Sequence, residues 1–345
     1  MVSERPSAFY LPPEWAPQAA IWLSWPTNPA LWPGRQEAIP AFFARFAAAI
    51  SQFETVRINA EQSRHAEILS LIEEAGGRRN CVELFDYRTD DVWCRDHGPL
   101  FLKDAETGEV AVSDWVFNAW GEKFSPFDRD DAVPRQIARW LGMKCFSHPE
   151  VLEGGAVEVN GARQLLTTES VLLNPNRKLP ESKPLIEDIL KKGLGVDEVF
   201  WLGEGLDGDD TDGHIDNLAR FVSNDTILAA TAEPSSPSYV ALRDNWRRLE
   251  SLRTKKGEPF NLIALPLPPL PVIAPADNRV LPASYVNYLL VNGAVLAPQY
   301  GQPADALALE ILTKAFPDRR ILGIDCRDVL IEGGALHCLS QQQPR

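Results

Sequence analysis

Two stretches of the chain read almost alike: VLEGGAVEV at residues 151–159 and LIEGGALHC at residues 330–338. Three strand-to-turn pieces, which begin at Val171, Ile227 and Val295, also resemble one another and lie 56 and 68 residues apart. A unit near that size fits about five times into 345 residues. Short apolar sequences of this kind can also recur by chance. True repetition would instead give units of strands plus a helix, packed radially around one central site.

Strand-like and helical patterns alternate along the chain. The strand-like runs are residues 20–25, 55–58, 110–117, 164–173, 214–222, 226–230, 286–291 and 329–339. The helical patterns are residues 36–53, 62–75, 130–141, 181–192, 238–253 and 303–316. Such alternation predicts an α/β or α+β architecture. No linker or low-complexity segment marks a boundary, so we expect one catalytic domain over residues 1–345.

The composition is that of a globular protein with an acidic balance. Hydrophobic residues make up 45% of the chain, which is too many for a disordered protein. The formal net charge of −14 argues against a nucleic-acid partner, because such proteins normally present a basic face. A negative field attracts small cations, so the charge favours a cationic ligand.

The cysteines and the first residues of the sequence indicate the cellular compartment. The five cysteines show no CxxC spacing, which disfavours a disulfide framework or a zinc ribbon. Residues 1–15 contain no apolar core of a signal peptide, and no uncharged run free of proline is long enough to span a membrane. We therefore expect a cytoplasmic protein with reduced thiols and no membrane partner.

Cys338 is the thiol with the most unusual setting, because Gly333 and Gly334 precede it closely. Glycine pairs beside a strand allow the backbone to approach a ligand. A single cysteine is most often a small buried hydrophobe, and that interpretation stays open. If residues 337 and 338 lie on a strand, His337 should face away from whatever Cys338 faces.

His214 and Asp216 form a better partner for a thiol. They are two residues apart at the start of a strand-like run, so their side chains should leave the same face. A solvated acidic turn is the alternative. Residues 207–218 do not match a calcium-binding loop. Counted from Asp207, Asp212 stands where glycine is needed and Leu218 stands where glutamate is needed.

Asp96 belongs to a third cluster, between Arg95 and His97. Alone, it could be a surface carboxylate paired with Arg95. However, Asp96 precedes Phe101 by five residues, just as Asp216 precedes Phe221 by five, so two repeats could present equivalent acids.

One thiol, one imidazole and several carboxylates at strand ends suit a planar cation. Two carboxylates can each accept paired N–H groups from one guanidinium and so fix its plane. A thiolate could then attack its central carbon. No phosphate loop, nucleotide fingerprint or HExxH metal pattern competes with this interpretation.

Several motifs resemble those of the agmatine deiminases, within the guanidine-modifying superfamily that also includes bacterial-type peptidylarginine deiminases. They are WCRDHGP at 93–99, FNAWG at 117–121, EGG at 153–155, LLNPNR at 172–177, GHIDN at 213–217, ASYVN at 283–287, APQYG at 297–301 and GGALHC at 333–338. The resemblance spans residues 9–344. It implies a five-bladed, pseudo-symmetric α/β propeller around a central active site.

The resemblance also implies an activity: cofactor-free and metal-free hydrolysis of agmatine to N-carbamoylputrescine and ammonia, through a covalent thiouronium, in polyamine (putrescine) biosynthesis. Cys338 would be the nucleophile and His214 the proton carrier, paired with Glu153. Asp96 and Asp216 would grip the guanidinium, and Trp93 would line the aliphatic chain. A homodimer is what the resemblance suggests.

The substrate is a separate question. Agmatine carries a second cation and no carboxylate, so its site needs an acid at the far end, for which Asp210 is the candidate; a plain surface acid is the alternative. The loops around residues 121–127 and 208–212 depart from the family pattern and border that end. Peptidylarginine or free arginine is therefore an alternative substrate. Two proteins of a different class, a polyamine-binding protein and a cysteine amidase, compete with a deiminase, but neither needs the full set of Cys338 and acids.

Overall fold

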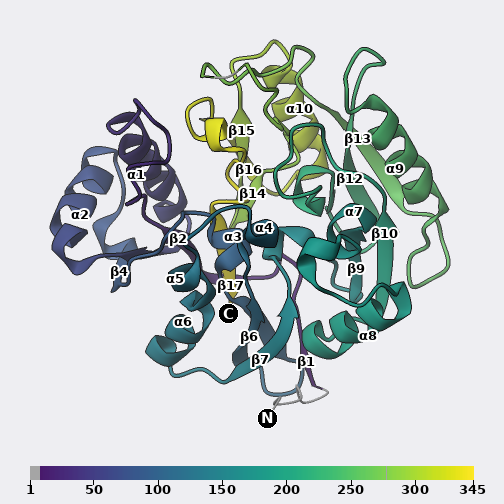
Figure 1. Ribbon diagram of the computed structural model, residues 1–345, viewed down its shortest axis with the longest axis horizontal. Helices are drawn as coiled ribbons and strands as arrows, with labels where there is room; N and C mark the ends of the chain where they lie inside the picture. The colour runs from purple at the N-terminus through teal and green to yellow at the C-terminus, as the bar shows by residue number, and fades with distance from the viewer. Residues whose placement is uncertain (1–7, 277) are drawn as a thin grey trace.

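The structure is a computed structural model that describes residues 8–276 and 278–345, and its strands form five separate sheets (Figure 1). Residues 1–7, part of the stretch in which we expect no signal peptide, lie outside this description. Strands and helices alternate along the chain, so the predicted α/β class is confirmed. In the part of the chain that is described, no helix is both long enough and apolar enough to cross a bilayer.

Each sheet has three or four strands, which follow in their spatial order. The sheets are β17 (Ser340–Pro344), β2 (Gln18–Ser24), β3 (Thr55–Ala60) and β4 (Val82–Asp86); β1 (Phe9–Tyr10), β5 (Leu100–Asp104), β6 (Val110–Val116) and β7 (Cys145–Val151); β8 (Glu158–Val159), β9 (Gln164–Thr168) and β10 (Glu198–Leu202); β11 (Ala219–Phe221), β12 (Thr226–Thr231) and β13 (Asn261–Pro266); β14 (Leu289–Val291), β15 (Ala294–Gln299) and β16 (Arg320–Asp325).

The same pairing pattern recurs in all five sheets. A first strand pairs antiparallel with a second, and the second pairs parallel with a third. Parallel neighbours need a crossover, and a helix supplies each one. These crossover helices are α1 (Ala38–Ser51), α6 (Val133–Leu141), α8 (Lys183–Leu194), α9 (Tyr239–Ser251) and α10 (Asp305–Ala315), and α2 (His65–Glu74) joins β3 to β4.

Local sequence explains how these elements begin and end. The central strands β12 and β15 are short apolar runs that are buried almost throughout. Pro134 and Pro184 stand in the first turns of α6 and α8, where a missing N–H is harmless. Gly142 and Gly195 end these two helices in the left-handed conformation. The long helices lie on the outside of the molecule (Figure 1).

Four short helices complete the fold: α3 (Cys94–His97), α4 (Ala119–Glu122), α5 (Asp128–Asp131) and α7 (Glu169–Leu172). Figure 1 shows α3 and α4 near the middle of the view. Single 3₁₀ turns include Gly154–Ala156, Ile215–Asn217 and Val329–Glu332. Such turns precede several of the first strands, so the irregular backbone gathers where the sheets begin.

Four strand predictions were wrong in part. In the run 286–291, only Leu289–Val291 is strand. In the run 164–173, residues 169–172 belong to α7, because β9 ends at Thr168. The run 214–222 starts as a 3₁₀ turn, and only Ala219–Phe221 is strand. The run 329–339 is a 3₁₀ turn and a loop, since Gly333 has a φ of +94° that no strand accommodates. The arrangement of the five sheets as propeller blades stays a prediction.

Candidate active site

Five short segments bring the polar residues of the site together. Each stands just before the strand that begins the repeated antiparallel–parallel pattern of one sheet. They contain Asp96 before β5, Glu153 before β8, His214 and Asp216 before β11, Asn287 before β14 and Cys338 before β17. Because each segment leads into an equivalent strand, equivalent backbone positions deliver different side chains to one place. The repeat that the sequence indicated therefore has a direct role in building this site.

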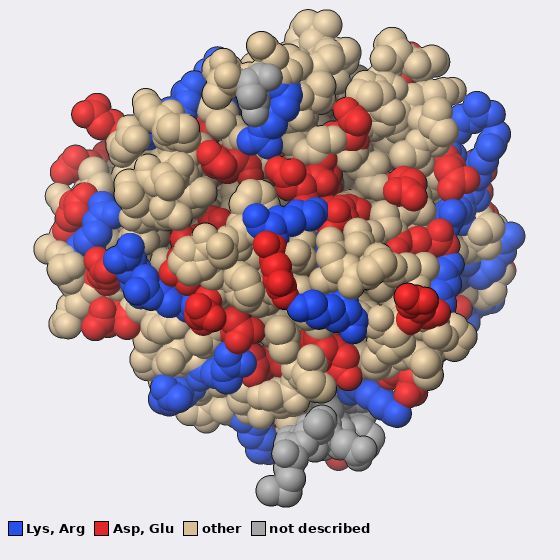
Figure 2. Space-filling model, viewed as in Figure 1, with Lys and Arg blue, Asp and Glu red and all other residues tan. Residues whose placement is uncertain are grey.

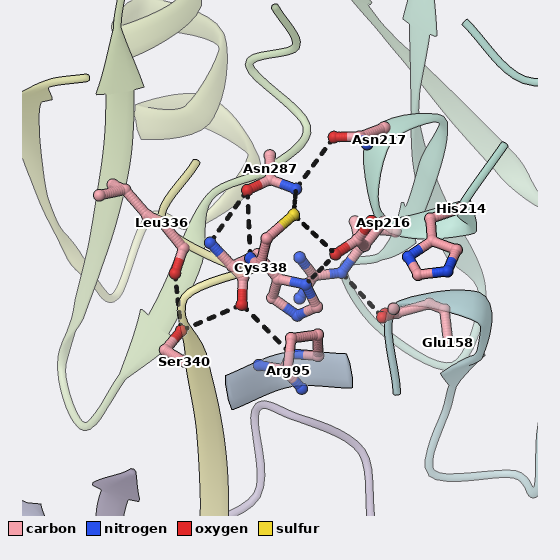
Figure 3. A network of polar contacts seen from close by, with 12 residues as sticks. Arg95, Glu158, His214, Asp216, Asn217, Asn287, Leu336, Cys338 and Ser340 are labelled. Atoms are coloured by element: carbon pink, nitrogen blue, oxygen red, sulfur yellow. Dashed lines mark hydrogen bonds and ion pairs between the residues drawn. The ribbon is translucent and has the colours of Figure 1, made fainter. Parts of the chain in front are cut away.

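Cys338 lies at the centre of a buried polar network (Figure 3). The Asn287 amide Nδ2 donates to its sulfur at 3.0 Å, and the Asp216 carboxylate oxygen Oδ2 lies 3.6 Å from the same sulfur. Burial, followed by the charges of Asp216 and Asp96, raises the pKa of the Cys338 thiol well above its usual value. With no cation present, the sulfur is therefore a protonated thiol.

Asp216 is fully buried and uses its two oxygens differently. Oδ2 contacts His337 Nδ1 at 2.7 Å as well as the thiol. Oδ1 is buried and has no hydrogen-bond partner among residues 8–276 and 278–345; we call it the open oxygen. Burial opposes ionisation of Asp216, but the hydrogen bond and charge of His337 outweigh it and lower the pKa of the carboxyl.

Asp96 is presented by α3 and held by two donors. The indole Nε1 of Trp120 donates to Oδ2 at 3.0 Å, and the backbone N–H of Gly155 donates to Oδ1 at 3.0 Å. Burial and the charges of Asp216 and Glu153 raise the pKa of Asp96 well above its usual value. The carboxyl is thus fixed in place but short of positive charge.

His214 lies between Asp96 and Glu153, with Nδ1 3.5 Å from Asp96 Oδ1 and Nε2 4.0 Å from Glu153 Oε2. Neither ring nitrogen has a hydrogen-bond partner within the described residues. Burial lowers the pKa of His214 to about 3, so the ring is neutral before a substrate binds. Arg177 donates to the other oxygen of Glu153 at 2.7 Å and fixes this acid beside the imidazole.

Trp93 and the glycine pair before Cys338 pack against each other. A Cβ atom on Gly334 would lie 2.2 Å from Cζ3 of the Trp93 ring, so only glycine fits there. The close approach that the glycines allow is therefore to Trp93. Trp93 itself is buried and stands beside the backbone that leads to the nucleophilic sulfur.

Asp210 lies apart from the buried cluster. Its side chain is 51% exposed and accepts a hydrogen bond from Arg279 at 3.2 Å. It nevertheless stands near the Cys338 loop, because a Cβ built on Gly333 would lie 3.9 Å from its carboxylate. A groove of about 560 Å³ is lined by Glu204, Asp207, Asp209 and Asp212, among others. Elsewhere on the visible face, acidic and basic side chains are interspersed (Figure 2).

Sequence reasoning gave no role to Asn287, His337, Glu14 and Arg177. Asn287 and Arg177 stand in quoted motifs but carry no chemistry that spacing alone reveals. His337 was expected to face away from the side of Cys338, which is wrong, because residues 336–339 form a turn and the ring contacts Asp216. Glu14 lies 323 residues from His337, its contact, and no local pattern signals it.

The chemical capacity of the site follows from its charges. Asp96 and Asp216 are both buried, yet no Lys or Arg side chain in the described part of the chain forms an ion pair with either. Two such carboxylates, one with an open oxygen, attract a cation that can donate several hydrogen bonds. The thiol and the neutral imidazole beside them supply a nucleophile and a proton carrier.

Comparisons with known proteins agree with this geometry. The family described as Porphyromonas-type peptidyl-arginine deiminase matches residues 10–344. Agmatine deiminase of Ectopseudomonas mendocina is 36% identical, over 99% of this chain and 96% of its own length. A structure of agmatine deiminase of Enterococcus faecalis has a TM-score of 0.92 at 32% identity and covers 100% of this chain and 99% of its own. A substrate-bound C. jejuni agmatine deiminase with a cysteine-to-serine change has a TM-score of 0.87 at 32% identity and covers 98% and 96%.

Proposed function

Because this chain belongs to the Porphyromonas-type peptidyl-arginine deiminase family, we propose that it hydrolyses agmatine to N-carbamoylputrescine and ammonia, as a step in polyamine biosynthesis. It is a hydrolase of C–N bonds in amidines that uses a cysteine nucleophile. One observation carries the proposal: two buried carboxylates, Asp96 and Asp216, lie beside a buried thiol without the positive charge that would balance them.

The first half of the reaction forms a covalent intermediate. Asp96 and the open oxygen of Asp216 accept hydrogen bonds from the guanidinium and hold its plane. The substrate's positive charge lowers the pKa of the Cys338 thiol, and the proton passes to neutral His214. The thiolate then adds to the central carbon. Imidazolium His214 returns the proton to one amino group, the C–N bond breaks, and ammonia leaves a thiouronium on Cys338.

The second half hydrolyses this intermediate. His214, again neutral, takes a proton from a water molecule, and the oxygen adds to the same carbon. As the C–S bond breaks, imidazolium His214 gives its proton to the sulfur, which restores the thiol. The remaining hydroxyl proton passes to the released ammonia or to solvent, and a neutral urea group is left. Glu153, fixed by Arg177, stabilises the imidazolium each time it forms.

The aliphatic part of agmatine sets the specificity. Trp93 offers an apolar wall for the methylene chain, close to the sulfur. Asp210 remains our candidate for the distal ammonium, which would share this carboxylate with Arg279. Free arginine or peptidylarginine is the alternative substrate and differs at this end alone.

A substrate panel tests the function. The ureido product would be measured from agmatine, free arginine and an N-acylated arginine amide. We expect kcat/KM to be highest for agmatine by at least about 100-fold. Free arginine would bring a carboxylate that the distal acid repels, and the blocked amide would leave that acid without its cation. If arginine or the blocked amide gave a kcat/KM equal to or above that of agmatine, agmatine would not be the preferred substrate. Absence of ureido product from all three would refute the proposed function.

A single methyl group at Gly155 should separate activity from stability. In Gly155→Ala, the new Cβ would lie 2.5 Å from His214 Nδ1 and 2.7 Å from Asp96 Oδ1, so both groups must move. We expect kcat/KM for agmatine to fall by roughly 100-fold. Gly257→Ala is the control: it meets nothing within 4 Å and has a positive φ of its own. It should lose about 1 kcal/mol of stability but no activity. Equal activity of the two variants would contradict the geometry.

Several expectations stay as proposals. We propose that residues 1–345 form one catalytic domain and that the five sheets are the blades of a pseudo-symmetric propeller. The recurring strand pattern and the supply of site residues by every sheet support this. A cytoplasmic location and a homodimer remain predictions from the sequence.

A further inference from the structure

His337 lies between two carboxylates and takes no part in the deimination steps. Its Nδ1 is 2.7 Å from Asp216 Oδ2 and its Nε2 is 2.9 Å from Glu14 Oε2. The ring is almost wholly buried, with 1% of the residue exposed. Both nitrogens thus face acceptor oxygens at short range, which is an unusual setting for an imidazole.

Counting hydrogens at Glu14 settles the state of Nε2. Arg220 Nη2 donates to Glu14 Oε2, and the backbone N–H of Leu290 donates to Oε1 at 2.8 Å. The Arg220 charge and the His337 contacts outweigh burial and hold the pKa of Glu14 well below its usual range. Glu14 is therefore an ionised carboxylate that only accepts, and the Nε2 atom must carry a hydrogen.

The contact with Asp216 needs a second hydrogen. Two bare lone pairs would repel at 2.7 Å, so a proton lies between Nδ1 and Oδ2. The trio of Glu14, His337 and Asp216 therefore holds two protons, and the lowered pKa of Asp216 puts the second on Nδ1. Arg95 and Arg220 supply positive charge beside this trio, and Glu158, which accepts from Arg220 at 2.7 Å, adds a further carboxylate.

The imidazole has little freedom to move. Asn287 Oδ1 accepts the backbone N–H of His337 at 3.0 Å, so the residue that contacts the sulfur also fixes this backbone. Arg220 lies between Glu14 and Glu158 and is itself fully buried.

We propose that His337 is a positioning residue: by donating through Nδ1 to Oδ2, it keeps Asp216 charged and directs the open oxygen to the guanidinium. This inference rests on the proposed deiminase function. Without the donor, Asp216 would be a buried acid beside Cys338 and Asp96, free to rotate or to take up a proton. The guanidinium clamp, which consists of Asp96 and Asp216, would then lose both charge and a fixed direction.

Two near-isosteric variants separate this role from a structural one. His337→Asn can place an amide N–H where Nδ1 stands and so retains the donor to Asp216 alone. His337→Gln reaches the position of Nε2 and retains the contact with Glu14 alone. We expect kcat/KM for agmatine to fall less than tenfold in His337→Asn and roughly 100-fold in His337→Gln. Each variant loses one buried contact, so thermal melting should fall in both.

A double-mutant cycle and a binding measurement complete the test. If His337 acts through Asp216, then His337→Gln adds no further loss in an Asp216→Asn background. Calorimetric titration of agmatine into Cys338→Ala should show weaker binding with His337→Gln than with His337→Asn, independently of turnover. Equal losses in the two His337 variants, or additive losses in the cycle, would overturn the inference. The proposed function would be refuted instead if the two variants bound agmatine in this order but the wild-type protein formed no ureido product.

Discussion

Replacing Cys338 by alanine is expected to lower kcat for agmatine by about 10⁴-fold or more, the scale of losing a covalent nucleophile. Without the sulfur, the clamp can still bind the guanidinium, but water alone must attack a resonance-stabilised carbon. Steady-state assay of the ureido product measures the loss. Cys81→Ala is the matched control, since Cys81 is a partly exposed thiol in a 3₁₀ turn outside the cluster. Retention of more than a few per cent of activity by Cys338→Ala would disprove the assignment.

The state of the thiol can be tested on the wild-type protein as well. Because burial and two carboxylates raise the thiol pKa, the thiolate fraction is small at neutral pH and grows as the pH rises above 9. Neutral chloroacetamide should therefore alkylate Cys338 slowly at pH 7 and faster with increasing pH. Chloroacetamidine, which carries its own positive charge into the clamp, should react at least about tenfold faster at pH 7. Equal rates for the two reagents would mean that no cation-responsive thiol exists here.

Asp96→Asn should lower kcat/KM by roughly 10²- to 10³-fold, the second large effect. The substitution preserves the shape of the side chain but removes the negative charge that pairs with the guanidinium. It also leaves an amide N–H group facing one of two donors, the Trp120 indole or the Gly155 backbone N–H, so the side chain loses its fixed orientation. Kinetics with agmatine measure the loss, and thermal melting excludes unfolding.

Asp225→Asn is the control for Asp96, because Asp225 is an exposed turn residue bonded to Ser223 and Thr226. It should change kcat/KM by less than about twofold. If Asp96→Asn also left kcat/KM unchanged, Asp96 would not belong to the clamp, and a single carboxylate would have to bind the substrate.

The sequence predicted the class of the fold because the periodic signals are local. Crossover helices such as α9 and α10 were anticipated to within about two residues, since their apolar spacing and flanking residues act within one turn. The segments around His214 and Cys338 were misread as strand for a specific reason. The apolar residues there are buried as in a strand, but the backbone forms 3₁₀ turns. The positive φ values of Gly213 and Gly333 mark these turns in the structure.

The site was predicted in part. Cys338, His214, Asp96 and Asp216 are reactive residue types in unusual company, which sequence can register. Glu14 could not be found in this way, because its value arises from a contact with His337 that only the completed fold creates. The function of Asn287 as a donor to sulfur depends likewise on a turn that no propensity encodes.

The pairing of β17 with β2 has a consequence for how the enzyme is made. The two strands come from opposite ends of the described chain, and the residue that carries the sulfur stands just before the later one. That segment is synthesised after the strands of the other four sheets, because β17 follows all of them along the chain. Shorter nascent fragments therefore contain the acids but not the sulfur, and the complete site forms only once β17 pairs with β2.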